Sequence, residues 1–136
     1  MADNDAMGPT AGLTPYLTIR GGAGAQAVEF YKTAFGAEER FRQPADDGKR
    51  LMHCHLVING TSVMLSDDFS SEPGPAPSGV TLHIQVDDAD AWWNRAQGAG
   101  PCAVTQPLAD QFWGDRYGRF KDPYGHGWSI GGPVKR

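Results

Sequence analysis

A proline- and serine-rich segment near the middle of the chain constrains the fold most, because the same order of elements precedes and follows it. Ser70 to Ser78 reads SSEPGPAPS, a composition that does not sustain a regular helix or strand. On either side, the spacing of apolar residues predicts a strand, then a helix, then further strands that end in a hairpin. The repeat therefore predicts two modules joined by a linker.

The first module is predicted from helical spacing and from one turn. Val28, Tyr31 and Phe35 recur at the period of a helix. Asn59-Gly60 lies between two alternating runs and predicts a two-residue hairpin, because both turn positions need a positive φ. The expected elements are a strand at Thr14 to Arg20, a helix at Gln26 to Phe35, and strands at Glu38 to Gln43, Arg50 to Ile58 and Thr61 to Ser66.

The second module repeats this order after the linker. Asp87 or Asp88 is placed to cap a helix, and Asp122 to Gly125 predicts a turn. The expected elements are a strand at Val80 to Val86, a helix to about Gln97, and strands at Arg116 to Lys121 and Gly127 to Ile130. We expect a flexible segment at residues 1–12 and a single domain over 13–136, with module one at about 13–69, the linker at about 70–78 and module two at about 79–132.

Composition excludes several classes of partner. The 136 residues carry a formal net charge of −4 and no basic block, which argues against a nucleic-acid surface and against an anionic membrane surface. Neither a signal peptide nor an apolar membrane span is recognisable, so the expected location is cytoplasmic. Cys54 and Cys102 are too few and too far apart for a zinc ribbon or a disulfide scaffold, and reduced thiols are expected.

Three stretches of the chain carry a family resemblance. They are Pro15 to Leu17 with Glu29 to Lys32 and Phe35-Gly36, then Met52-His53 to Leu65-Ser66-Asp67, and finally Phe112 to Arg116 with Asp122 to Trp128. On these motifs the chain resembles the vicinal oxygen chelate superfamily (the glyoxalase, bleomycin-resistance and dioxygenase group) and, more narrowly, its PhnB-like branch. The resemblance implies an α+β fold of two βαβββ modules that form a curled mixed-sheet cup with helices outside. It also implies a ligand pocket completed by two modules and a homodimer.

Strand alternation predicts which side chains would line such a pocket. The hairpin pairs His55 with Met64 and His53 with Ser66, which places these residues together on one face. The opposite face is uniformly apolar and suits helix packing; it comprises Met52, Cys54, Leu56, Ile58, Val63 and Leu65. In the second module Thr81, His83 and Gln85 share one face, and Leu82, Ile84 and Val86 share the apolar one.

The resemblance also implies where metal-binding members of the superfamily hold their ligands. By spacing, these positions fall on Thr14, Met64, Thr81 and Ser129, and none of them is a histidine or a carboxylate. Because hydroxyl and thioether groups are poor ligands for a hard divalent ion, no metal cofactor is expected. A register slip of two residues would bring His83 into a ligand position.

Two alternatives give the histidines a chemical role. His53, His55 and His83 could converge on a divalent metal such as Zn, Fe, Ni or Mn. His83 alone could act as a general base and is the candidate catalytic residue. The alternative to both is that the three imidazoles line a pocket or face solvent and hold hydrogen bonds.

The segment before the last hairpin offers further candidates. Phe112 and Trp113 lie in a predicted loop, where aromatic side chains favour ligand stacking or a dimer contact. Asp115 and Arg116 are interpreted as an ion pair that shapes this loop, with a role in a site as the alternative, in which the arginine could hold an anionic substrate.

The leading functional prediction is a metal-free small-molecule-binding protein of the bleomycin-resistance type that takes an apolar or aromatic ligand. The predicted ligand-binding residues are His53, His55, Met64, Thr81, His83, Gln85, Trp113, Phe120 and Ser129. The second hypothesis is a metal-dependent glyoxalase-like lyase or dioxygenase. The third is a dimeric interaction module without small-molecule chemistry, for which we expect a closed, side-chain-filled cup.

Overall fold

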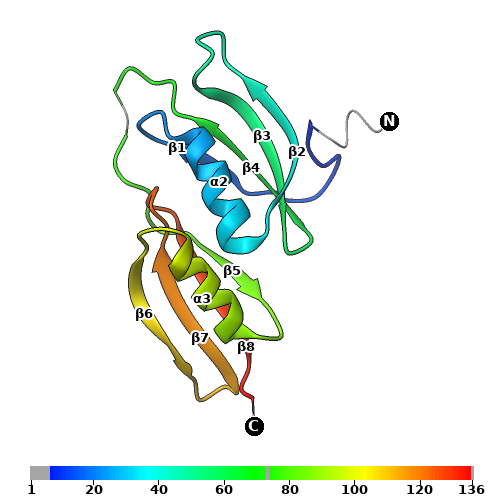
Figure 1. Ribbon diagram of the computed structural model, residues 1–136, viewed down its shortest axis with the longest axis vertical. Coiled ribbons are helices and arrows are strands. Elements are labelled where there is room, and N and C mark those ends of the chain that lie inside the picture. Colours follow the sequence, from blue (N-terminus) through cyan, green and yellow to red (C-terminus); the bar gives the residue numbers. More distant parts are fainter. Residues whose placement is uncertain (1–6, 73, 136) are drawn as a thin grey trace. The chain divides into compact units, whose positions relative to one another are not determined.

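The computed structural model describes residues 7–72 and 74–135. The chain divides into two units, Met1–Gly74 (unit one) and Pro75–Arg136 (unit two), and the boundary falls within the segment predicted as a linker. Over these described residues, each unit contains one long helix and a four-stranded sheet (Figure 1). Among the described residues, no helix is long and apolar enough to cross a membrane.

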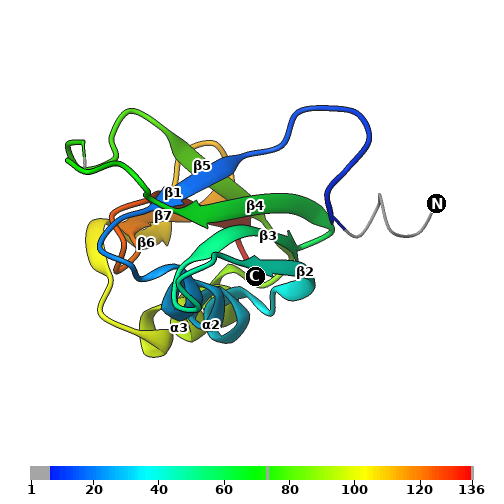
Figure 2. The same cartoon turned by 90° about the horizontal axis from the view of Figure 1, so that it is seen from above.

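Unit one has the predicted order of elements. It contains β1 (Tyr16–Ile19), α2 (Gly24–Phe35), β2 (Glu38–Pro44), β3 (Leu51–Ile58) and β4 (Thr61–Asp67). The sheet order is β1-β4-β3-β2; β1 runs parallel to β4, and the other neighbours are antiparallel. Figure 2 shows α2 on one side of this sheet.

Unit two repeats the topology. It contains β5 (Thr81–Gln85), α3 (Ala89–Ala99), β6 (Ala103–Asp110), β7 (Asp115–Lys121) and β8 (Gly127–Pro133). The sheet order is β5-β8-β7-β6, again with a single parallel pair, β5 with β8. The α+β fold of two βαβββ modules is therefore confirmed, each with a mixed sheet and a helix on one face.

Strand β6 was not anticipated from the sequence. It is an edge strand that, among the described strands, pairs only with β7, and its side chains are mostly exposed. Pro107 lies within it, and the register shifts between Val104 and Gln106 and again before Ala109. An exposed edge strand that contains a proline lacks both the alternating pattern and the uninterrupted run from which strands are predicted.

The hairpin of unit one has the predicted turn and register. Asn59 and Gly60 have φ values of 48° and 81°, as the turn requires. Ile58 pairs with Thr61 and His55 with Met64. One residue departs from the predicted faces: Met52 is 48% exposed rather than packed under the helix. The β2–β3 register skips it, because Gln43 pairs with His53 and Pro44 with Leu51, so a bulge turns its side chain away from the core.

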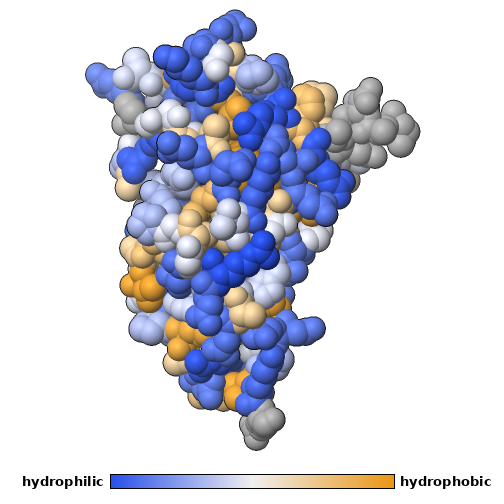
Figure 3. All heavy atoms as spheres, in the orientation of Figure 1, coloured by the Kyte–Doolittle hydropathy of each residue, from blue (hydrophilic) through white to orange (hydrophobic). Residues whose placement is uncertain are grey.

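Each helix buries one stripe against its own sheet. In α2, Val28, Tyr31 and Phe35 are almost fully buried, and the rings of Tyr31 and Phe35 stack at 6.1 Å. In α3, Trp93 packs edge-on to Phe120 at 5.6 Å, and its ring lies over Gly118, where a Cβ would approach it to 2.6 Å. On the face of the molecule drawn in Figure 3, hydrophilic residues predominate, with smaller apolar areas between them.

Candidate functional site

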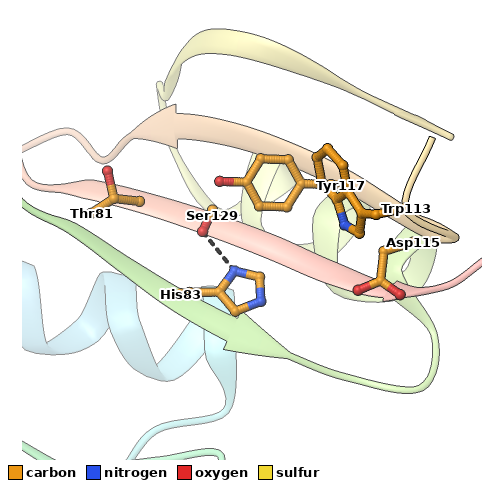
Figure 4. A pocket seen from close by; sticks show the side chains of 6 residues that line it. All are labelled: Thr81, His83, Trp113, Asp115, Tyr117 and Ser129. Atoms are coloured by element: carbon orange, nitrogen blue, oxygen red, sulfur yellow. Dashed lines mark hydrogen bonds between the residues drawn. The ribbon is translucent and has the colours of Figure 1, made fainter. Parts of the chain in front are cut away.

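The face of the unit two sheet opposite α3 carries an open pocket. Registry across the strands aligns His83 of β5 with Ser129 of β8 and Arg119 of β7, and the next row aligns Gln85, Gly131 and Tyr117. The pocket has a volume of about 390 Å³ (Figure 4). Its lining residues are Thr81, His83, Trp113, Asp115, Tyr117 and Ser129.

Gly131 of β8 lets the ring of His83 lie close to the sheet in this pocket. A Cβ on Gly131 would come within 2.9 Å of His83 Cε1 and 3.2 Å of Gln85 Oε1. The imidazole of His83 therefore occupies the space that a side chain at position 131 would take. The ring of Tyr117 stacks on it, with centroids 5.7 Å apart and planes at 26°.

A chain of hydrogen bonds holds the His83 ring in place. Gln85 Nε2 donates to Asp115 Oδ2 at 3.1 Å, so the other amide atom of Gln85, its carbonyl oxygen, points to His83. Because a carbonyl only accepts, His83 Nε2 carries a proton and donates to Gln85 Oε1 at 2.7 Å. In the neutral ring, His83 Nδ1 then accepts from the Ser129 hydroxyl at 2.7 Å.

This arrangement restricts the chemistry available to His83. Both ring nitrogens are engaged within the protein, and the hydroxyl that faces Nδ1 belongs to Ser129, which is only 1% exposed. The histidine is an exposed residue nonetheless, and it lines the pocket. Such a side chain is suited to stacking, whereas acid–base catalysis on a bound molecule would first require one of these hydrogen bonds to break.

The loop before β7 adds a second aromatic wall. Trp113 is 51% exposed and meets Tyr117 edge-on at 5.6 Å. Gly114 follows with a φ of 97°, a value that turns the chain into β7 directly after the tryptophan. Phe112 is 97% exposed and contacts Trp113 at 5.0 Å. The predicted loop position of both aromatic residues is thus confirmed, and only Trp113 lines the pocket.

Two residues near this segment lie differently from the prediction. Phe120 is 1% exposed and packs against Trp93 of α3, so the prediction that it lines the pocket is wrong. Arg116 forms ion pairs with Asp90 at 3.0 Å and Asp110 at 3.0 Å, and not with Asp115. Alternation along β7 explains both corrections, because even-numbered residues face the helix and odd-numbered residues face the pocket.

Tyr117 was missed by the sequence reasoning. The turn at Asp122 to Gly125 is confirmed by a hydrogen bond from Gly125 N to Asp122 O at 3.0 Å. Its closure pairs Phe120 with Trp128 and Arg119 with Ser129, so Tyr117 shares the face of Ser129. Counting outward from this turn, as was done for the other hairpin, would have selected Tyr117 in place of Phe120.

The predicted site residues of unit one lie on the corresponding face of their own sheet. His53 Nε2 donates to the Met7 carbonyl at 2.6 Å, and its Nδ1 faces the Tyr16 hydroxyl at 2.8 Å. His55 is 3% exposed and its Nε2 bonds to Ser62 Oγ at 2.9 Å. Met64 lies beside Gly8, where a Cβ would meet its sulfur at 3.0 Å. Residues 7 and 8 of the segment predicted to be flexible thus contact this face, and residues 1–6 lie outside the described part.

The side chains that the resemblance assigns by spacing to metal positions are poor ligands for a divalent cation. Within either unit, the described residues hold no group of three histidine, cysteine or acidic side chains that could ligate a metal ion. In unit two the two assigned residues carry hydroxyls, and the strand register aligns His83, not Thr81, with Ser129. Ser129 is bonded to His83, and Thr81 Oγ1 accepts from Arg119 Nη2 at 2.7 Å. A guanidinium bonded to a would-be ligand repels a cation, so these donors suit a neutral or anionic molecule better.

Comparison with known proteins agrees with this architecture. An uncharacterized protein of Mycobacterium tuberculosis is 45% identical over 141 residues, an alignment that covers 98% of this chain and 81% of that one. The crystal structure of a Pseudomonas aeruginosa protein, PA1353, superposes with a TM-score of 0.75 at 26% identity and covers 93% of this chain and 100% of that one.

A PhnB protein of Bacillus cereus, described as a putative 3-demethylubiquinone-9 3-methyltransferase, has the same fold. Its TM-score is 0.74 at 20% identity, over 88% of this chain and 98% of that one. The sequence profile of one superfamily matches residues 14–130, which spans both units. The chain therefore belongs to the glyoxalase/bleomycin resistance protein/dioxygenase superfamily.

Proposed function

We propose that the protein binds a small molecule with an aromatic ring in the pocket of unit two, without a metal ion, in the manner of bleomycin-resistance proteins. One observation carries this proposal: the ring of Tyr117 contacts those of His83 and Trp113, and all three line one open pocket. Stacking on such rings, with a few polar groups to orient the ligand, is sufficient for binding and needs no reaction.

The hydrogen-bond chain favours binding over catalysis. A general base needs a nitrogen that can reach the proton of a bound substrate, and both nitrogens of His83 are held by Ser129 and Gln85. A lyase or dioxygenase of this superfamily would need a metal, and the hydroxyls of Thr81 and Ser129 are poor donors for one. An open pocket also argues against an interaction module with a filled cup.

The proposal is tested by titration with an uncharged aromatic probe, 4-nitrobenzyl alcohol, a quencher of tryptophan fluorescence. We expect saturable binding by isothermal titration calorimetry, with quenching that Trp113→Phe abolishes. Replacing Tyr117 by Ala should weaken binding by about 2- to 10-fold, the contribution of one aromatic pair. The matched control is Trp92→Phe, because Trp92 lies on α3, on the other side of the sheet. Unchanged affinity in Tyr117→Ala would contradict the proposed pocket.

The absence of a metal cofactor is a separate part of the proposal with its own measurement. After dialysis of untagged protein against Mn, Fe, Co, Ni and Zn in turn, elemental analysis should find no stoichiometric metal. A retained metal that disappears in His83→Ala would overturn the metal-free hypothesis and favour the lyase and dioxygenase alternatives.

The homodimer remains a prediction, and light scattering coupled to size-exclusion chromatography measures it.

A further inference from the structure

Two side chains of opposite charge mark the two ends of the unit two pocket: Asp115 lines it, and Arg119 bonds to Thr81, which lines it. Arg119 and Asp115 both project from the pocket face of β7, separated by Tyr117. Within the described residues of unit two, neither side chain forms an ion pair. Arg116, on the other face of the same strand, is paired with two carboxylates. The pocket face thus leaves charges uncompensated where the helix face neutralises them.

Thr81 orients the cationic end. Its hydroxyl accepts from Arg119 Nη2 at 2.7 Å, which leaves the other N–H donors of the guanidinium for a ligand. Thr81 is itself a lining residue and lies at the end of the pocket away from Asp115 (Figure 4). A guanidinium held in this way matches the two oxygens of a carboxylate, and charge-assisted pairs of this kind are among the stronger hydrogen bonds in proteins.

Gln85 orients the anionic end. Its amide donates to Asp115 Oδ2 at 3.1 Å, and the second carboxylate oxygen remains available to a donor on a ligand. Trp113 lies on the same side of the pocket as Asp115 in Figure 4. An aromatic ring beside a carboxylate favours a cationic amine, because the amine can bond to the oxygen and interact with the ring face.

From these two ends we infer that the ligand is amphoteric: a flat aromatic molecule with a carboxylate at the Arg119–Thr81 end and an amine at the Asp115 end. Arg119 lies four positions after Asp115, a span of about 13 Å along an extended strand. A two-ring aromatic with substituents at its far ends, together with its hydrogen bonds, fits that span. The inference rests on the proposed function, since it specifies the ligand of the same pocket.

Three related probes separate the contributions of the two ends. They are 6-(aminomethyl)-2-naphthoic acid, its methyl ester, which lacks the acid, and its N-acetyl derivative, which lacks the cation. Each is titrated by calorimetry into the full-length protein and into Arg119→Gln, Asp115→Asn and Arg116→Gln. The last variant is the control, because it removes an arginine of the same strand from the opposite face.

We expect the amphoteric acid to bind most tightly. Arg119→Gln should weaken its binding by roughly 10- to 100-fold, the range for one charged hydrogen bond, and leave the ester unchanged. Asp115→Asn should weaken the two amine-bearing probes and leave the N-acetyl derivative unchanged. Arg116→Gln should change none of the three affinities.

The outcomes distinguish this inference from the proposed function. If all three probes bind with equal affinity and the Arg119 and Asp115 variants change nothing, the amphoteric ligand is overturned while aromatic binding stands. If no probe binds, and 4-nitrobenzyl alcohol does not bind either, the proposed function fails and the inference fails with it. Selective losses at each end support the assigned polarity.

Discussion

The two units place a histidine on the same face of the same kind of sheet and use it differently. In unit one, His53 donates to the main-chain carbonyl of Met7, so Met7 lies against this face. In unit two, His83 donates to the side chain of Gln85, which is bonded to Asp115, and the face beside it forms an open pocket. The repeated fold supplies the same sheet face twice. In unit one this face is contacted by another residue of the chain, and in unit two it is left open as a pocket.

The helix N-termini differ in a second instructive way. Asp88 caps α3 locally by accepting from Ala91 N at 3.1 Å. No residue next to α2 does so; instead Asp67, at the end of β4, accepts from Gly24 N at 2.7 Å and from Leu51 N at 2.6 Å. A Cβ on Gly24 would meet the Asp67 carboxylate. In unit one the glycine lies on the helix and the larger residue on the strand. In unit two the glycine, Gly132, lies on strand β8, and the larger residue, Ala89, lies on helix α3.

Replacing Asp67 by Ala has the largest expected effect on stability. Asp67 is 2% exposed, and its loss leaves two buried N–H groups without an acceptor, at about 1–3 kcal/mol each. We expect the free energy of unfolding to fall by about 3 kcal/mol or more, measured by urea titration with circular dichroism. Asp88→Ala is the control, with a smaller loss because its carboxylate is exposed to water. Equal losses of unfolding free energy in the two variants would mean that Asp67 stabilises the protein no more than the local cap Asp88 does.

Gly132→Ala tests whether the close contact between β8 and the start of α3 requires a glycine on the strand. The added Cβ would lie 2.3 Å from the Val86 carbonyl oxygen, and relief requires the backbone to shift. We expect a loss of about 1–3 kcal/mol. All four tryptophans lie in unit two, so tryptophan fluorescence follows its unfolding directly. Gly98→Ala in α3 is the matched control, since its Cβ would meet nothing, and it should be neutral or slightly stabilising. A neutral Gly132→Ala would contradict the tight contact between strand and helix.

The smallest expected effect is a pH dependence of the local cap. The backbone N–H of Ala91, and then Lys135, hold the pKa of Asp88 below its usual value of 3.8. A folded-state pKa below the unfolded one stabilises the protein above the unfolded value, and this stability is lost as the pH falls through the folded value. Urea midpoints followed by tryptophan fluorescence should therefore decline below about pH 4. In Asp88→Asn, which keeps the cap without the titration, the decline should be shallower; identical slopes would assign it to other groups.

Features that depend on neighbouring residues were predicted correctly from the sequence, and features that depend on a partner strand were not. Asn59-Gly60 determined both a turn and the register of its strands, because positive φ is a property of those two residues. The prediction that Phe120 lines the pocket was wrong because it depended on which residues of β7 face the helix. The residues of β7 alone do not show this, since its register with β8 decides it. Met52 failed for a related reason, since a bulge depends on the partner strand.

The candidate site was predictable in part. Thr81, His83, Trp113 and Ser129 were chosen from the sequence, and the structure brings all four to one pocket. Tyr117 and Asp115 complete the lining. Tyr117 was not expected there, and Asp115 was interpreted first as the partner of Arg116. Gln85 was expected as a ligand contact, and its observed role is to connect His83 with Asp115. The predicted residues of unit one lie on a separate sheet with partners of their own.

The sequence by itself determined the elements of this protein, their repeated order and the superfamily, because apolar spacing, turn residues and short motifs act over a few neighbouring positions. Only the tertiary structure decided that Asp67 caps a helix 43 residues away and that Asp115, through Gln85, sets the proton of His83. Such contacts join residues that are distant along the chain. They depend on strand register, which no single segment specifies.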